Sequence, residues 1–231
     1  MRIIIISDLH ANCEALRPLP EACDELWVLG DLVNYGPNPV EVVDWVRAHA
    51  TLVVRGNHDH SVGYGVDPQC SPRFRAMAEA TGRFSAAALD DARKRFLREL
   101  PLDAVREVDG VRFRLCHAVP SEPLYPYCRA DSERWREEAA KLDADILLVG
   151  HTHLPFRIAY GERTIVNPGS LGQPKHGRAE ACYAVWDDGT LELRSYPYAV
   201  DETIAALAAL PLASEIRTDL AEVLRTGSVP R

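Results

Sequence analysis

Histidines, aspartates and one asparagine are concentrated in five short polar segments, each close after a run of apolar residues. Five of the eight histidines fall in these segments. Imidazole and carboxylate groups bind divalent metal ions, and a metal centre can bind the oxygen atoms of a reacting group. The segments are Asp8-Leu9-His10, Gly30-Asp31, Gly56-Asn57-His58-Asp59, His117 and Gly150-His151-Thr152-His153.

Each segment taken alone is a weak signal, because Asp-x-His and His-x-His triplets occur often by chance. A polar turn or a helix-capping residue would explain any one of them. Five such segments in order, each after an expected strand, are much harder to explain in that way. Together they predict a metal centre.

The elements between these segments follow the order of an α/β protein. Apolar runs rich in β-formers at 3–6, 26–29 and 52–54 are separated by segments of helical length, which indicates βαβ units and largely parallel strands. In open α/β sheets, ligands collect at the carboxyl ends of the strands. We therefore expect the five polar segments to converge on one edge of the sheet.

The remaining elements are less regular. Pro18 and Pro20 predict that the first connecting helix, which begins near Asn12, is short or broken. After Gly150, short runs separated by turn signals indicate antiparallel strands and a second sheet. The further expected helices are 40–49, most of 71–100, 132–142, 201–210 and 214–224, and the further expected strands are 111–116 and 146–149.

Composition excludes several classes of protein. The 231 residues, 47% of them hydrophobic, predict a single globular domain over residues 1–231, with a helical cap-like segment around 60–100. The net charge of −8 argues against stable nucleic-acid binding, and no apolar run is long enough for a membrane span.

The N-terminus lacks signal-peptide features, so we expect a cytoplasmic protein. The six cysteines form no Cys-x-x-Cys pair, so we expect no thiolate zinc site. A homo-oligomer is compatible with the sequence.

Taken together, the motifs Asp8-x-His10, Gly30-Asp31, Gly56-Asn57-His58-Asp59 and Gly150-His151-x-His153 resemble those of the calcineurin-like metallophosphoesterases. The resemblance covers residues 1 to about 196 and is closest to the YfcE-like branch of small bacterial phosphodiesterases, in which turns like 35–39 and 167–170 also occur. It implies an α/β fold in which a double β-sheet sandwich is flanked by helices.

The resemblance also implies two divalent metal ions, manganese first, with iron, zinc, cobalt or nickel as alternatives, because mixed imidazole and carboxylate ligands disfavour magnesium and calcium. Asp31 would bridge the two ions, and a hydroxide between them would attack phosphorus. The first ion would be bound by Asp8, His10, Asp31 and His153, and the second by Asp31, Asn57, His117 and His151.

His58 resembles the catalytic histidine of the family and, with Asp31, would be catalytic. In the protein phosphatases of the superfamily a carboxylate orients this histidine, whereas Asn34 occurs here, so we expect a weak general acid and a preference for good leaving groups. Asn57 and His58 would also contact substrate. Lys175 and Arg129 are candidate phosphate contacts, although a solvated loop explains them equally well.

The expected function is dinuclear metal-dependent hydrolysis of small phosphate esters, with phosphodiesters first. A phosphatase that acts on monoesters, proteins or dinucleoside polyphosphates shares the same ligands and stays open. A non-catalytic interaction module of this fold, as in the retromer subunit, would have lost ligands or His58, and all are present. A nuclease of the superfamily would need a longer and more basic chain.

Overall fold

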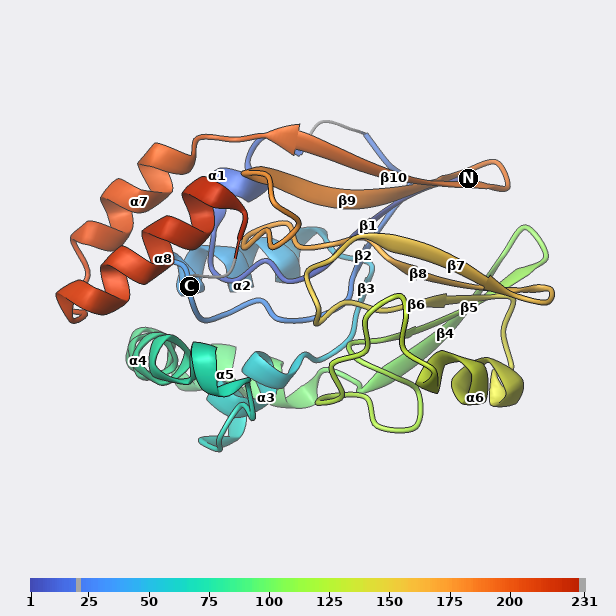
Figure 1. Cartoon of the computed structure of the whole chain (residues 1–231), viewed down its shortest axis with the longest axis horizontal. Helices are drawn as coiled ribbons and strands as arrows, with labels where there is room; N and C mark the ends of the chain where they lie inside the picture. Colours follow the sequence, from blue (N-terminus) through green and yellow to red (C-terminus); the bar gives the residue numbers. More distant parts are fainter. Residues whose placement is uncertain (20–21, 229–231) are drawn as a thin grey trace.

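Two five-stranded sheets stack face to face, and helices cover their outer faces (Figure 1). The computed structural model describes residues 1–19 and 22–228. The predicted double β-sheet sandwich flanked by helices is confirmed.

The first sheet contains the N-terminal strands in the order β10-β9-β1-β2-β3. The predicted parallel pairing is confirmed, because β1 pairs parallel with β2 and β2 pairs parallel with β3. β9 lies antiparallel on the other side of β1. The strands are β1 (Arg2–Ile6), β2 (Glu25–Val28), β3 (Leu52–Val53), β9 (Glu180–Asp187) and β10 (Thr190–Pro197).

The second sheet has the order β4-β5-β6-β8-β7. The prediction that the strands after Gly150 make the second sheet is wrong for β9 and β10, which extend the first one. The reason is burial: six consecutive residues of β9, from Ala181 to Trp186, are buried, so both faces of β9 must be covered and it lies inside a sheet. The strands are β4 (Asp103–Val108), β5 (Val111–Cys116), β6 (Ile146–Leu148), β7 (Phe156–Tyr160) and β8 (Arg163–Asn167).

The helices agree largely with the sequence pattern. The first one is a single turn, as predicted, and Pro18 follows it, whereas Pro20 lies outside the described residues. One helix was missed, because the polar segment at 56–59 opens α3 rather than a simple turn. The helices are α1 (Cys13–Leu16), α2 (Pro39–His49), α3 (Asn57–Tyr64), α4 (Pro72–Ala88), α5 (Asp91–Glu99), α6 (Arg134–Lys141), α7 (Val200–Ala208) and α8 (Ser214–Thr226).

Alternation along β1 divides the core. Ile4 and Ile6 face the apolar side of α2, while Ile3 and Ile5 point between the two sheets, as the two-residue period of a strand requires. The inter-sheet layer also contains Trp27, whose ring meets that of Phe113 at 5.2 Å in an edge-to-face contact. This rigid double layer fixes the carboxyl ends of the central strands of both sheets.

A separate apolar cluster joins α4 to the helical pair α7 and α8 and includes Tyr35 and Phe74. These helices gather at one end of the molecule, on the same side as the loops that follow β1 and β2 (Figure 1). None of the helices in the described part of the chain combines the length and apolar character that crossing a membrane requires.

Candidate metal centre

The structure brings all seven predicted metal ligands together. Asp8 and His10 follow β1, Asp31 follows β2, Asn57 begins α3 after β3, His117 follows β5, and His151 and His153 follow β6. Six of the seven side chains are buried, and His151 is half-buried. Strands from both sheets therefore deliver polar side chains to one place in an otherwise apolar interior.

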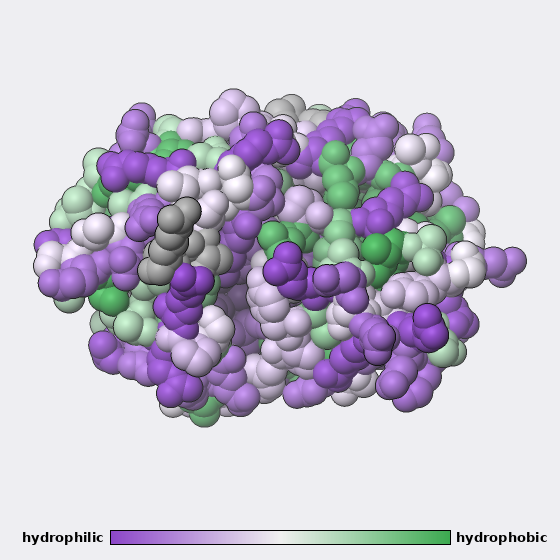
Figure 2. All heavy atoms as spheres, in the orientation of Figure 1, coloured by the Kyte–Doolittle hydropathy of each residue, from purple (hydrophilic) through white to green (hydrophobic). Residues whose placement is uncertain are grey.

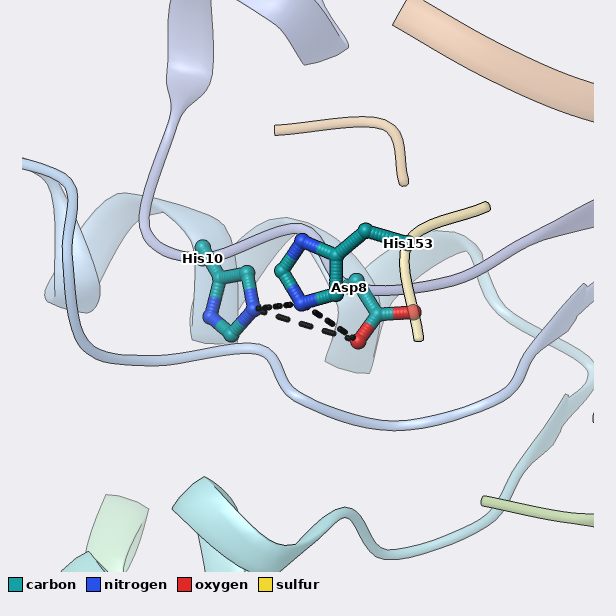
Figure 3. A group of neighbouring side chains, drawn as sticks. All are labelled: Asp8, His10 and His153. Atoms are coloured by element: carbon teal, nitrogen blue, oxygen red, sulfur yellow. Dashed lines mark hydrogen bonds and ion pairs between the residues drawn. The ribbon is translucent and has the colours of Figure 1, made fainter. Parts of the chain in front are cut away.

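Asp8, His10 and His153 form the first group, with ligand atoms that all lie within 4.8 Å of one another. Nε2 of His153 lies 3.3 Å from Oδ1 of Asp8 and 3.1 Å from Nε2 of His10. Figure 3 shows the two imidazole rings and the carboxylate turned toward a common point. The three side chains can act as ligands of one ion.

Asp31, His117 and His151 form the second group, within the same limit of 4.8 Å. Nε2 of His117 lies 3.2 Å from Oδ2 of Asp31 and 3.1 Å from Oδ1 of Asn57. The amide nitrogen of Asn57 donates to the carbonyl of Pro68 at 2.7 Å, so the amide oxygen is the atom that faces the group. Asn57 thus offers a fourth ligand atom.

Asp31 connects the two groups. Its Oδ2 lies 3.8 Å from Nε2 of His10 in the first group and 3.2 Å from Nε2 of His117 in the second. Its Oδ1 accepts a hydrogen bond from the backbone N–H of His58 at 2.9 Å. The carboxylate is therefore held where it can be shared between two ions.

Backbone carbonyls orient the four histidines. In each ring one nitrogen lies within hydrogen-bond distance of a carbonyl oxygen, which only accepts, so in the neutral ring that nitrogen carries the proton. The other nitrogen then presents its lone pair to the site. The pairs are His10 Nδ1 with Val33 (3.0 Å), His117 Nδ1 with Leu29 (2.7 Å), His153 Nδ1 with Gln173 (2.6 Å) and His151 Nε2 with Tyr125 (3.0 Å).

This arrangement fits bound cations. The Nε2 atoms of His10 and His153 face each other, and neither carries a proton when both rings are protonated on Nδ1, so two lone pairs meet. In addition, Oδ1 of Asp8 is buried without a hydrogen-bond partner among the described residues. Unsatisfied acceptors that face one another in the interior are costly unless a cation lies between them. The donor set of imidazole, carboxylate and amide oxygen atoms suits a transition metal.

Electrostatics agree with this assignment. Burial holds the pKa values of His10 and His153 well below the ordinary value and lowers the pKa of His151 to about 3, so these rings stay neutral. His117 differs: burial lowers its pKa, but the charge and hydrogen bond of Asp31, the charge of Asp8 and the carbonyl of Leu29 together outweigh burial and raise the pKa to about 9. A metal ion would have to replace that proton.

Backbone strain is concentrated at the centre. Eleven non-glycine residues in the described part of the chain have positive φ, and five of them are candidate ligands: Asp8, His10, Asp31, His151 and His153. Such conformations are uncommon for residues with a Cβ atom and cluster at functional sites. The backbone of these turns therefore adopts costly conformations that point the five side chains toward the centre.

Asp59 holds the Asp31 turn, a role that the sequence reasoning missed. Its buried carboxylate accepts backbone hydrogen bonds from Gly56 (3.0 Å), Asp31 (2.8 Å) and Leu32 (2.8 Å). The available signal was its place at the end of the Gly56-Asn57-His58-Asp59 motif. The two turns also touch directly, because a Cβ atom on Gly56 would lie 2.0 Å from Oδ1 of Asp31.

His58 is buried beside the candidate metal ligands. Its hydrogen-bond partner is Asn34, the residue at which this sequence departs from the protein phosphatases. The amide nitrogen of Asn34 lies 2.7 Å from Nδ1 of His58. Because an amide nitrogen only donates, Nδ1 accepts, and the neutral ring carries its proton on Nε2. Burial lowers the pKa of His58 to about 4.

The centre opens on a cavity of about 390 Å³. The surface in Figure 2 is hollowed near the middle of the face shown. Lys175 lines the cavity, with its ammonium group 4.2 Å from the ring centre of Phe74. Arg129 is exposed and is not among the residues that line the cavity. The lining residues are Asp31, Tyr35, Asn57, His58, Gln69, Cys70, Ser71, Arg73, Phe74, Tyr125, Tyr127, His151, His153 and Lys175.

Comparison with known families agrees with the fold. Residues 1–189 match the calcineurin-like phosphoesterase superfamily domain, which is most of the chain. The chain belongs to this superfamily and is a metal-dependent phosphoesterase.

Two relatives and one solved structure are similar to this chain over most of their length. An uncharacterized protein of Methanocaldococcus jannaschii is 29% identical over 207 residues, which cover 80% of this chain and 82% of the relative. Phosphodiesterase YfcE of Escherichia coli is 26% identical over 212 residues, with 84% and 91% covered. The crystal structure of a metallophosphoesterase from Sphaerobacter thermophilus superposes with a TM-score of 0.81 at 30% identity, over 96% of this chain and 98% of that one.

Proposed function

We propose that this protein hydrolyses small phosphodiesters with two divalent metal ions, manganese first among the candidates. The observation that carries the proposal is the pair of ligand groups joined by Asp31 at the floor of a cavity that also contains His58 and Lys175. Similarity to a phosphodiesterase over most of the chain supports the diester preference. We infer that residues 1–231 work as one domain, with the helical segment around 60–100 as the cap of the cavity.

When bound, the two ions would supply an activated hydroxide nucleophile and neutralise charge on the phosphoryl oxygens. The residues of the chain divide the remaining work. Asp8, His10 and His153 would hold one ion, Asn57, His117 and His151 the other, and Asp31 both. Nε2–H of His58 would donate to a phosphoryl oxygen, and the Lys175 ammonium would bind a second one.

The hydrogen bond between Asn34 and His58 supports a restriction on the leaving groups of the substrate. A carboxylate in place of Asn34 would stabilise the imidazolium form, whereas the neutral amide does not. The ring is therefore a poor proton donor to a leaving group, and we propose that esters of acidic alcohols, such as phenols, are the favoured substrates. Asn57 and His58 would contact the substrate directly, and Arg129 would contact larger substrates from outside the cavity.

The ions and the compartment are further parts of the proposal. Iron, zinc, cobalt and nickel suit the same donor set, and the ion that copurifies with activity would identify the native one. All six cysteines are free, which is typical of a reducing compartment and supports action in the cytoplasm.

The test combines metal analysis with two assays. We expect about two ions per chain and manganese-dependent hydrolysis of bis-p-nitrophenyl phosphate that exceeds hydrolysis of p-nitrophenyl phosphate. Bound metal with faster monoester hydrolysis would instead indicate a phosphatase, and dinucleoside polyphosphates would then be assayed next. A folded protein that binds no metal and hydrolyses neither ester would indicate an interaction module.

A further inference from the structure

The cavity wall beside the metal centre is unusually aromatic. Four of its fourteen lining residues are phenylalanine or tyrosine, although aromatic residues make up 7% of the chain. Tyr35 and Phe74 belong to the apolar cluster of α4, α7 and α8, so packing explains them. Tyr125 and Tyr127 lie outside the four apolar clusters of the described residues, and packing does not explain why they line the cavity.

Tyr127 combines exposure with a fixed position. Its side chain is among the most exposed of the large apolar residues, at 54%. Its hydroxyl donates to the carbonyl of Thr152 at 3.0 Å, and its ring centre lies 5.7 Å from that of His151. An aromatic ring that is held by its polar end, is about half exposed and lines the cavity is suited to stack on a flat ligand group.

Tyr125 is attached to the same ligand turn from its backbone. Its carbonyl accepts from Nε2 of His151 at 3.0 Å. The loop that contains both tyrosines is therefore tied to the His151-Thr152 turn at two points, and the distance between the aromatic wall and the metal ligands is set by hydrogen bonds. A ligand that reaches both must have a fixed spacing between its anionic group and its flat group.

Charge and size narrow the ligand further. Lys175 and Arg73 line the cavity, and the acidic residue among the lining residues, Asp31, is a candidate metal ligand, so the remaining lining favours an anion. A volume of about 390 Å³ lies near the lower end of the roughly 300 to 1,000 Å³ that is common for small-molecule sites. The space suits one nucleotide-sized molecule better than a polymer.

Resting on the proposed phosphodiesterase function, we propose that the substrate is a nucleotide-type phosphodiester whose nucleobase stacks on Tyr127, with Tyr125 completing the wall. The phosphate would lie on the metal ligands, and the base would be part of the group that is retained on phosphorus. Tyr127 is then a specificity-determining residue, and the reaction itself does not depend on its hydroxyl.

The test compares two diesters with the same p-nitrophenolate leaving group: thymidine 5′-(p-nitrophenyl phosphate) and ethyl p-nitrophenyl phosphate. We expect the manganese-loaded protein to prefer the thymidine ester about tenfold in kcat/KM, which is within the range of base stacking on an aromatic side chain. Tyr127→Leu should reduce this preference to about twofold, mainly by raising KM for the thymidine ester. Tyr127→Phe, which keeps the ring but loses the hydrogen bond to Thr152, should retain most of the preference.

Tyr64→Leu is the matched control, because Tyr64 is exposed to a similar degree, 50%, and does not line the cavity. A binding measurement adds a readout without turnover: calorimetry should show that thymidine 5′-monophosphate binds more tightly than methyl phosphate, and that Tyr127→Leu removes the difference. If kcat/KM were equal for the two esters, both in the parent protein and in Tyr127→Leu, the proposed stacking of the base on Tyr127 would be refuted. The proposed phosphodiesterase function would be unaffected by that result. If the metal-loaded protein hydrolysed neither ester, the proposed function would fail and the inference with it.

Discussion

The amide nitrogen of Asn34 donates to Nδ1 of His58 over 2.7 Å, and both side chains are buried. This contact leaves the proton of the neutral ring on Nε2, the atom that is free to reach a substrate. Because Asn34 is neutral, it does not stabilise the imidazolium form of His58 as a carboxylate would, and the ring is a weaker base.

Asn34→Asp should therefore broaden the range of leaving groups. The added carboxylate would raise the pKa of His58 from about 4 toward neutrality, so that the ring could protonate a departing alkoxide. The ratio of kcat/KM for methyl p-nitrophenyl phosphate to that for bis-p-nitrophenyl phosphate should stay unchanged, because both release p-nitrophenolate. For esters with alkyl leaving groups we expect kcat/KM to rise roughly tenfold. The measurement is the slope of log kcat/KM against leaving-group pKa, which should become shallower. An unchanged slope would mean that His58 does not protonate the leaving group.

Asp31→Ala and His58→Ala should both remove most or all of the turnover, but for different reasons. Removal of Asp31 takes away the carboxylate shared by the two ligand groups, so we expect loss of bound metal as well as activity. Removal of His58 should leave metal content unchanged and lower kcat about 10² to 10⁴-fold. Metal analysis beside the assay separates the two. Full metal content in Asp31→Ala would refute the bridging role.

Gly56→Ala tests the contact between the two ligand turns. A Cβ atom there would lie 2.0 Å from Oδ1 and 2.4 Å from the backbone nitrogen of Asp31, so the Asp31 turn would have to move. We expect a loss of about 1 to 3 kcal/mol in the free energy of unfolding, together with weaker metal binding. Gly82→Ala in α4 is the control, because its Cβ would meet Asn34 at an ordinary 3.4 Å. Chemical denaturation and metal titration of both variants measure the two effects. Equal stability and equal metal affinity in the two variants would mean that the contact between the turns is unimportant.

Lys175 should make substrate binding depend on pH. Burial lowers the pKa of its ammonium group to about 8, so the group is charged below pH 8 and neutral above it. We expect KM to rise as pH increases through 8, because the positive charge that attracts phosphate is lost. Lys175→Met should raise KM about tenfold and remove this rise. A KM for the parent protein that is flat from pH 7 to 9 would exclude Lys175 as a phosphate contact.

The convergence of the candidate metal ligands could be predicted because each lies in a short motif close after a strand, and the apolar pattern of those strands is clear. Asp59 stood in the same motif, but its role depends on hydrogen bonds to a turn 28 residues earlier, which spacing does not reveal. Tyr125 and Tyr127 were also missed, because the loop that presents them has no periodic pattern. The position of β9 was set by burial on both faces, a property of the assembled sheet.

The left-handed turns at Asp8, His10, Asp31, His151 and His153 have a consequence for how this protein changes under selection. Glycine accepts positive φ at little cost, so a glycine at any of these positions would relieve strain but remove a candidate metal ligand. Variants chosen for heat resistance alone would therefore drift toward folded but inactive proteins. Thermostabilising libraries should leave these five codons fixed and place their diversity on the outer helices.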